Sequence, residues 1–208
     1  HEVEKTSVTV NKDWQDGSNQ DGIRPESITV KLLANGEQAK GADGNDLIAT
    51  ITPDANGNWT YTWSELDKYK AGEKITYTVE ENAVENYNTP SEPITLKEAE
   101  NGYIGTITNT HEVEKTSVTV NKDWQDGSNQ DGIRPDSVSI TLNATVENSD
   151  GEEESITLPN TVESTITLNE GNSWTYTWSG LDKYKNGQEI KYTVAENNVD
   201  ERYTVSIK

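Results

Sequence analysis

Three residues whose side chains could together make an amide bond lie on the apolar faces of three separate predicted strands. In SVTVNKDW, strict alternation puts Lys12 on the same face as two valines, and in ITYTVEE and GTITN the inward phase takes Glu81 and Asn109. A lysine is almost never fully buried without a partner. One interpretation is that each residue ends its strand and that Lys12 extends its ammonium to water. The other is that all three meet inside a sandwich, and it is favoured because two of them recur in a second copy.

A buried lysine, carboxyl and amide are the groups that an intramolecular isopeptide bond requires. Burial penalises charge, so it lowers the pKa of a lysine and raises that of a glutamate, which favours the neutral amine and the neutral acid. The amine of Lys12 could then attack the side-chain carbonyl carbon of Asn109, while Glu81 polarises that carbonyl and passes a proton to the departing ammonia. The pattern therefore predicts one cross-link, between Lys12 and Asn109, with Glu81 as its catalyst.

A long internal repeat divides the chain into two predicted domains. Residues 1–25 recur unchanged as residues 111–135, a period of 110 residues. Solenoid repeats have periods of about 20 to 50 residues, so each copy is expected to be a whole domain, the first covering 1–110 and the second 111–208. The connection THEVEKT is short and contains no Gly or Pro, which predicts that the domains stack end to end as a rod.

The second copy keeps only two of the three reactive residues. Lys122 and Glu196 stand at the corresponding positions, but no asparagine matches Asn109. In the first copy 22 residues lead from Tyr87 to that asparagine, whereas only five residues follow the equivalent Tyr203. We therefore expect the second domain to lack its last strand in this chain, which leaves Glu196 as its catalytic glutamate and Lys122 as an unpaired cross-link lysine.

The fold class predicted from the pattern of residues is all-β. Short runs rich in Val, Ile, Thr, Tyr and Trp alternate with clusters of Gly, Asn, Asp and Pro, and no stretch holds a helical period for three turns, which is typical of a sandwich. The segment SELDKYK after Trp63 could form a short helical turn opened by Ser64. If Lys12 and Asn109 touch, the first and last strands must run parallel and side by side. Strands are expected near residues 6–13, 27–34, 47–52, 58–64, 74–81, 92–97 and 103–109 of the first copy.

Charge and composition exclude several function classes. The chain has 17 Lys plus Arg against 37 Asp plus Glu, a formal net charge of -20, and such a field repels nucleic acid and anionic membranes. It has no cysteine, no apolar run of membrane-spanning length, and two histidines, His1 and His111, so neither a zinc site nor a histidine-based triad is expected. We predict no cofactor, no nucleic-acid partner and no membrane insertion, and we interpret the chain as a segment of a longer protein.

The loop DWQDGSNQDG, present in both copies, brings four oxygen-bearing side chains close together in the sequence. In the first copy they are Asp13, Asp16, Asn19 and Asp21. An EF-hand calcium loop needs alternating acidic positions and a glutamate at its twelfth position, and the spacing here does not fit. Asx turns and glycines with positive φ explain the same composition. We therefore predict no metal site, with loose calcium binding as the alternative.

The series VTVNKDW, NQDGIRP, NWTYTW, LDKY, YTVEE and TITNT resembles the Cna B-type repeats of Gram-positive surface adhesins. The likeness covers nearly the whole chain and implies two tandem inverse-immunoglobulin, transthyretin-like β-sandwiches. Many members of that family carry an intramolecular isopeptide bond between a lysine and an asparagine, with an acidic catalyst. By motif, the family's lysine falls on Lys12 and Lys122, its glutamate on Glu81 and Glu196, and its asparagine on Asn109.

The resemblance implies a structural stalk or spacer repeat, and no enzyme beyond a single self-cross-linking step. Such a segment would be extracellular, on a cell wall-anchored surface protein, with neighbouring repeats of the same chain as partners and the host extracellular matrix bound through other domains. The alternative is a module that itself binds a host glycan or protein. Trp59, Tyr61 and Trp63 share one face of NWTYTW and could stack on sugars, although such an aromatic row more often forms core.

Overall fold

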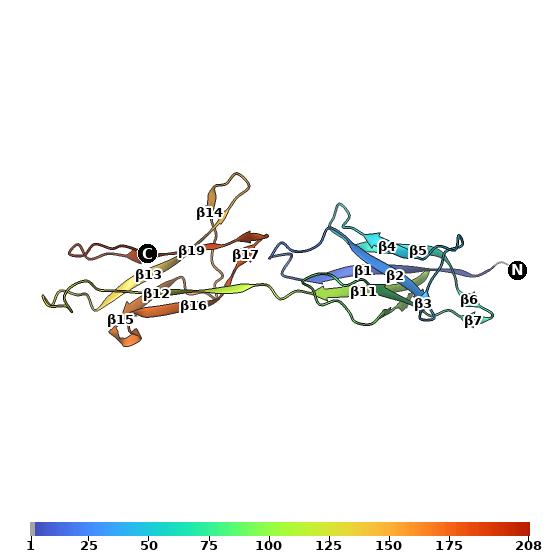
Figure 1. Cartoon of the computed structure of the whole chain (residues 1–208), viewed down its shortest axis with the longest axis horizontal. Coiled ribbons are helices and arrows are strands. Elements are labelled where there is room, and N and C mark those ends of the chain that lie inside the picture. Colours follow the sequence, from blue (N-terminus) through green and yellow to red (C-terminus); the bar gives the residue numbers. More distant parts are fainter. Residues whose placement is uncertain (1–2) are drawn as a thin grey trace. The chain divides into compact units, whose positions relative to one another are not determined.

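Residues 3–208, which the computed structural model describes, form two compact units whose regular secondary structure is almost entirely β-strand (Figure 1). Among these residues the helical element is a 3₁₀ turn, η1 (Glu170–Asn172). The all-β fold class predicted from the sequence is confirmed. One unit contains residues 3–18 and 23–112, and the other contains residues 19–22 and 113–208.

The first unit is a sandwich of two sheets. Its strands are β1 (Lys5–Gln15), β2 (Ile28–Ala34), β3 (Glu37–Gln38), β4 (Ile48–Ile51), β5 (Thr60–Asp67), β6 (Tyr69–Lys70), β7 (Glu73–Lys74), β8 (Tyr77–Glu81), β9 (Ile94–Thr95), β10 (Lys97–Ala99) and β11 (Gly102–Thr110). One sheet has the order β10-β11-β1-β5, and the other has the order β3-β2-β8-β9 with β4 also pairing with β2. The short β6 and β7 form a hairpin of their own.

The core of the first unit lies between these sheets. Val8 of β1, Val30 of β2 and Val79 of β8 are fully buried, as their inward phase predicts. Burying such a side chain stabilises the fold by about 1.5–3 kcal/mol. Trp59 and Trp63 are 6% and 5% exposed and belong to the same core. Two of the three aromatic residues in NWTYTW are therefore core residues.

The first and last strands of this unit run parallel and side by side (Figure 1), which confirms the prediction made from the cross-linking chemistry. Their register sets Lys12 opposite Ile107 and Trp14 opposite Asn109. Since residues i and i+2 of a strand share a face, Asn109 lies on the face of β11 that carries Ile107. The topology therefore brings the lysine and the asparagine to the same end of two neighbouring strands.

The helical turn predicted after Trp63 is wrong, because β5 continues through this segment as a strand. Its pairing with β1 shifts register: Thr6 lies opposite Leu66 and Val8 lies opposite Trp63, so β5 contains one extra residue. Glu65, in the bulge, has a φ of 57°. A β-bulge of this kind bends a strand and interrupts its alternation, which is why the segment resembled the end of a strand.

The second unit has the same plan with fewer paired strands. Its strands are β12 (Lys115–Asn121), β13 (Ser137–Glu147), β14 (Glu153–Ser155), β15 (Thr165–Asn169), β16 (Thr175–Asp182), β17 (Tyr184–Lys185), β18 (Gln188–Glu189) and β19 (Lys191–Asn197). β13 pairs with β14, β15 and β19, whereas β12 pairs with β16 and, within the described chain, has no parallel neighbour. Val118 and Val120 of β12 are consequently only partly buried, although their counterparts Val8 and Val10 are fully buried.

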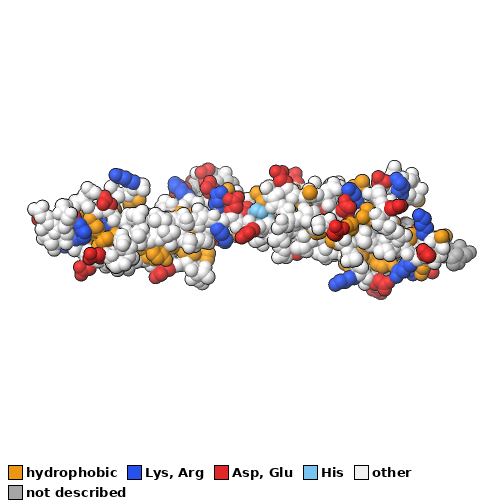
Figure 2. Space-filling model, turned by 60° about the horizontal axis from the view of Figure 1, so that its bottom comes forward, with side chains coloured by type: hydrophobic (Ala, Val, Ile, Leu, Met, Phe, Trp, Pro, Cys, Tyr) orange, Lys and Arg blue, Asp and Glu red, His pale blue; other side chains and the backbone are white. Residues whose placement is uncertain are grey.

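Charged side chains are spread over the surface of the molecule. On the face drawn in Figure 2, Asp and Glu lie scattered, with Lys and Arg between them. Exposed ion pairs such as Lys5 with Asp67 at 2.7 Å contribute about 0–1 kcal/mol each. In residues 3–208 there is no helix with the length and apolar character needed to cross a membrane.

Candidate functional site

Lys12 lies near the C-terminal end of β1 with its side chain turned into the sandwich. Only 9% of the residue is exposed. Its Nζ donates hydrogen bonds to the backbone carbonyl oxygens of Asp13 at 2.9 Å and Ile107 at 3.4 Å. The second of these bonds joins the lysine to β11, the strand that carries Asn109.

Glu81 and Asn109 approach Lys12 from two other strands. Glu81 is the last residue of β8, in the opposite sheet, and the two residues are 8% and 0% exposed. Both carboxyl oxygens of Glu81 and both side-chain polar atoms of Asn109 are buried without a hydrogen bond of normal geometry to the described residues. Leaving a buried polar group unpaired costs about 1–3 kcal/mol. Such an arrangement is rare in a purely structural core and calls for a chemical explanation.

Burial shifts both titratable groups of this site toward their neutral forms. It lowers the pKa of Lys12 to about 8, although the nearby carboxyl of Glu81 acts in the opposite direction. It also raises the pKa of Glu81, while the charge of Lys12 and the adjacent amide of Asn109 oppose that rise. A neutral amine is the nucleophilic form of lysine. The site therefore brings together an amine, a carboxyl and a side-chain amide, the three groups that an isopeptide bond would require.

The lowered pKa of Lys12 predicts how the stability of an unlinked domain depends on pH. In Asn109→Ala the folded-state pKa of about 8 lies below the ordinary value of 10.5, so the unfolded chain binds more protons between these pH values. Stability rises with pH wherever the unfolded state binds more protons. The urea midpoint of the first domain should therefore increase as the pH rises from 8 toward 10.5.

The matched control for this pH dependence is Lys12→Met in the same Asn109→Ala background. It removes the titrating amine and should abolish the increase in the urea midpoint. An equal increase in the presence and absence of Lys12 would show that other groups cause it.

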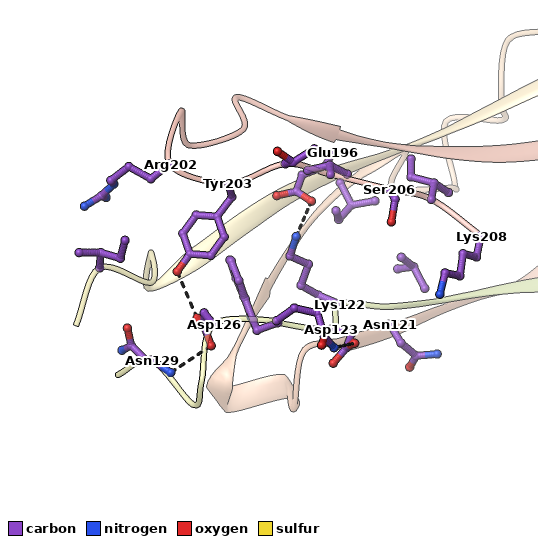
Figure 3. A pocket seen from close by; sticks show the side chains of 18 of the residues that line it. Asn121, Lys122, Asp123, Asp126, Asn129, Glu196, Arg202, Tyr203, Ser206 and Lys208 are labelled. Atoms are coloured by element: carbon purple, nitrogen blue, oxygen red, sulfur yellow. Dashed lines mark hydrogen bonds and ion pairs between the residues drawn. The ribbon is translucent and has the colours of Figure 1, made fainter. Parts of the chain in front are cut away.

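The second unit brings Lys122 and Glu196 together. The Nζ of Lys122 lies 2.9 Å from Oε2 of Glu196, and Figure 3 shows the two side chains pointing toward one another. A groove of about 1220 Å³ runs along β12 and the loop that follows it. In the part of the chain that the structure describes, no strand occupies the position beside β12 that β11 occupies beside β1. Lys122 has a carboxyl partner there but no asparagine from a neighbouring parallel strand.

The loop after β1 forms an ion pair around Asp16. This buried carboxylate accepts hydrogen bonds from Arg24 at 2.6 and 2.9 Å and from the hydroxyl of Tyr87 at 2.8 Å. Residues 3–208 contain no cluster of three His, Cys, Asp or Glu side chains that could hold a metal. Sequence reasoning missed Arg24 and Tyr87. The sequence signal that could have identified them is that both residues, like Asp16, recur in the second copy.

The sequence pattern of the Cna protein B-type domain matches residues 8–110 and again residues 118–208. The chain belongs to the Cna protein B-type domain family. The resemblance noted from the sequence motifs is thereby confirmed, and so is the presence of two B-type domains in tandem. B-type domains of this kind are repeat domains of surface adhesins, a structural family without enzymatic turnover.

A curated relative of this pair of B-type domains is the collagen adhesin of Staphylococcus aureus. The two are 40% identical over 205 residues, which are 99% of this chain and 14% of the adhesin. The chain thus spans a small part of the length of that relative.

Two solved structures of B-type domains are also similar to this chain. One is a single B repeat unit (B1) of the collagen-binding surface protein of S. aureus, with 39% identity, coverage of 99% of this chain and 92% of that chain, and a TM-score of 0.40. The other contains two B repeat units (B1B2) of the same protein, with 39% identity, coverage of 99% and 46%, and a TM-score of 0.39.

Proposed function

We propose that this chain is a stalk segment of a bacterial surface adhesin whose first domain is made rigid by an isopeptide bond between Lys12 and Asn109. The observation that carries the proposal is the burial of Lys12, Glu81 and Asn109 at one end of β1, β8 and β11, with the polar atoms of the last two unpaired. An amide hydrogen-bonded to a neutral carboxyl would satisfy groups that otherwise remain unpaired in a low-polarity environment.

The proposed reaction exchanges one amide for another. The neutral Nζ of Lys12 attacks Cγ of Asn109, while the protonated carboxyl of Glu81 donates a hydrogen bond to Oδ1 and so stabilises the developing negative charge. The carboxyl of Glu81 then passes its proton to Nδ2 and takes one from Nζ, so that the bond from Cγ to Nδ2 breaks and ammonia leaves. One C–N bond forms, one C–N bond breaks, and Glu81 ends in the state in which it began.

This bond would lie on the path of a pulling force. A force applied along the chain enters the first domain through β1 and leaves it through β11, and these two strands are parallel neighbours. A covalent link from Lys12 to Asn109 joins the entering strand directly to the leaving strand. The 96 residues between them, 13–108, would then carry no load. That behaviour suits a spacer that must not lengthen.

The wider proposal concerns the whole segment. Its two domains cover residues 1–110 and 111–208, and the second carries Lys122 and the catalytic Glu196 without a cross-link in this chain. It would act at the extracellular, cell wall-anchored surface, with neighbouring repeats as its partners. Other domains of the longer protein would bind host extracellular matrix. The collagen-binding name of the S. aureus relative supports that division of roles.

The alternative function, direct binding of a host glycan or protein, loses its best candidate surface. Trp59 and Trp63 face the core, so that of the three aromatic residues in NWTYTW only Tyr61, 38% exposed, offers a face to solvent. One half-exposed ring is a poor platform for stacking on a sugar. A glycan array probed with the 208-residue chain should therefore give no specific signal.

Single-molecule pulling from both ends tests the stalk proposal. With the bond present, we expect no unfolding step from the first domain. In Lys12→Ala a new step should appear, because 96 additional residues become extensible and release about 3.6 Å each, roughly 350 Å in total. A step of this length in the unsubstituted chain as well would contradict the proposal.

A further inference from the structure

The indole of Trp14 covers the amine of Lys12. The Nζ of Lys12 lies 3.8 Å from the centroid of the indole ring, and the guanidinium carbon of Arg24 lies 5.4 Å from it. The rings of Trp59 and Tyr87 meet the indole edge-on, with centroid distances of 5.3 and 4.9 Å. Because Trp14 is partly exposed while Lys12 is 9% exposed, the indole separates the amine from water at this end of the sandwich.

A single buried carboxylate fixes the groups that hold this indole. Asp16, 2% exposed, binds Arg24 through both carboxylate oxygens and accepts the hydroxyl hydrogen of Tyr87. Bidentate pairs of arginine and carboxylate have strict geometry, and a buried charge pair is tolerated only where that geometry is good. Arg24 and Tyr87 both contact Trp14, so the position of the indole depends on Asp16.

The indole nitrogen shows that the ring is not placed for a hydrogen bond. Nε1 of Trp14 is buried without a partner among the described residues, and so is Nε1 of Trp124, its counterpart in the second unit. Buried tryptophans usually pair this N–H, and an unpaired buried donor costs about 1–3 kcal/mol. A phenylalanine would avoid that cost. Tryptophan is, however, the best ring for contact with an amine or ammonium, which explains its use in both copies.

The same cluster forms in the second unit, where β12 has no parallel neighbour. The Nζ of Lys122 lies 4.4 Å from the centroid of the Trp124 ring. The hydroxyl of Tyr203 donates to Asp126 at 3.1 Å (Figure 3), and Asp126 also pairs with Arg134. The cluster in the second unit therefore forms without a strand that carries an asparagine.

We propose that Trp14 is a positioning residue for the cross-link. Held by Asp16, Arg24 and Tyr87, it keeps the Nζ of Lys12 inside the sandwich and shielded from water while β11 closes the domain. The inference rests on the proposed function for the reaction that Lys12 undergoes. It adds the residue that positions the amine. In the second unit the cluster forms without a parallel neighbouring strand, which indicates that the indole covers the amine before β11 closes the domain.

The charges around the amine determine what removal of the indole should do. Burial lowers the pKa of Lys12 most. Glu81 from β8, Asp13 at the end of β1 and Asp16 in the following loop raise it, and Arg24 from that loop lowers it. Without the indole, water reaches the amine and its pKa should return toward 10.5. For each unit by which the pKa of Lys12 rises, the uncharged fraction of the amine near pH 7 falls about tenfold.

The test compares Trp14→Leu with Trp63→Leu, which removes another core indole far from Lys12. Chains from a short pulse of cell-free translation are arrested, diluted into buffers that range from neutral pH to above 10.5, and quenched in acid. The loss of ammonia is then followed by intact mass. Trp14→Leu should react at least about tenfold more slowly near neutral pH and should move the pH midpoint of the rate upward by a unit or more. Trp63→Leu should leave the midpoint unchanged.

Trp14→Phe provides the conservative rescue, since it keeps an aromatic ring over the amine and should recover most of the rate. An unchanged rate and midpoint in Trp14→Leu, or equal midpoint shifts in both leucine variants, would overturn the inference.

A second measurement separates this inference from the proposed function. The Lys12 amine is titrated by NMR in Asn109→Ala, which cannot cross-link, with and without Trp14→Leu. A higher midpoint in the double variant supports the positioning role, and an equal midpoint refutes it. If the unsubstituted chain never loses ammonia, the proposed function fails, and the same titration performed in that chain still decides the role of Trp14.

Discussion

Replacing Glu81 with glutamine should leave the first domain unlinked and lower its melting temperature by roughly 20 °C. Glutamine fills the same space but cannot relay a proton from the amine to the leaving ammonia. The bond between Lys12 and Asn109 closes a loop of about 100 residues, which by the loop-entropy relation stabilises the folded state by about 4.7 kcal/mol. For a domain of this size, 1 kcal/mol corresponds to about 4–8 °C. Calorimetry combined with intact mass measures both effects on one sample.

The matched control is Glu80→Gln on the same strand. Glu80 faces solvent and pairs with Lys31 at 3.1 Å, with both side chains partly exposed. Loss of such a pair changes stability by about 0–1 kcal/mol, so the melting temperature should move by only a few degrees and the bond should form normally. If Glu81→Gln removes the bond and the melting temperature stays the same, the bond is not the source of the domain's stability.

Limited proteolysis should cut the second domain of the unsubstituted chain first, by a wide margin. In that domain β12 has an unpaired edge within the described chain and its inward valines are only partly buried. Unpaired edges open readily and are accessible to other chains. A stabilisation of about 4.7 kcal/mol in the first domain alone reduces its open population on the order of 10³-fold, and cleavage follows that population when opening is fast.

The cleavage experiment has an internal control in Glu81→Gln. Loss of the bond should raise the cleavage rate of the first domain toward that of the second, while the second domain is cut at its original rate. Equal protease resistance of the two domains in the unsubstituted chain would contradict the assignment of a single cross-link to the first domain.

The inward placement of the candidate site was predictable because it follows the period of the strands. Alternation alone places Lys12, Glu81 and Asn109 on inward faces, and all three are buried. The parallel pairing of the terminal strands was also predictable, because the proposed bond demands it, and β1 and β11 are paired in this way. A two-residue period and the reach of a side chain were sufficient for both predictions.

Other features left no periodic signal in the sequence. The bulge at Glu65 depends on how β5 fits against β1 and looks locally like the end of a strand. The contact between Asp16 and Tyr87 joins residues 71 positions apart in two loops, and no alternation rule reports on such pairs. The predicted strand near residues 92–97 is divided into the short β9 and β10, which lie in different sheets, because sequence reasoning did not anticipate a change of sheet there.

Intact mass spectrometry of the 208-residue chain, followed by tryptic digestion, tests the cross-link most directly. We expect a mass lower than the sequence mass by one ammonia, and a branched peptide that joins the strand of Lys12 to the strand of Asn109. Lys122 should remain a free amine that an acylating reagent modifies, and Lys12→Ala should restore the full mass. A full mass in the unsubstituted chain, with Asn109 recovered as a free amide, would contradict the isopeptide bond and the stalk function proposed from it.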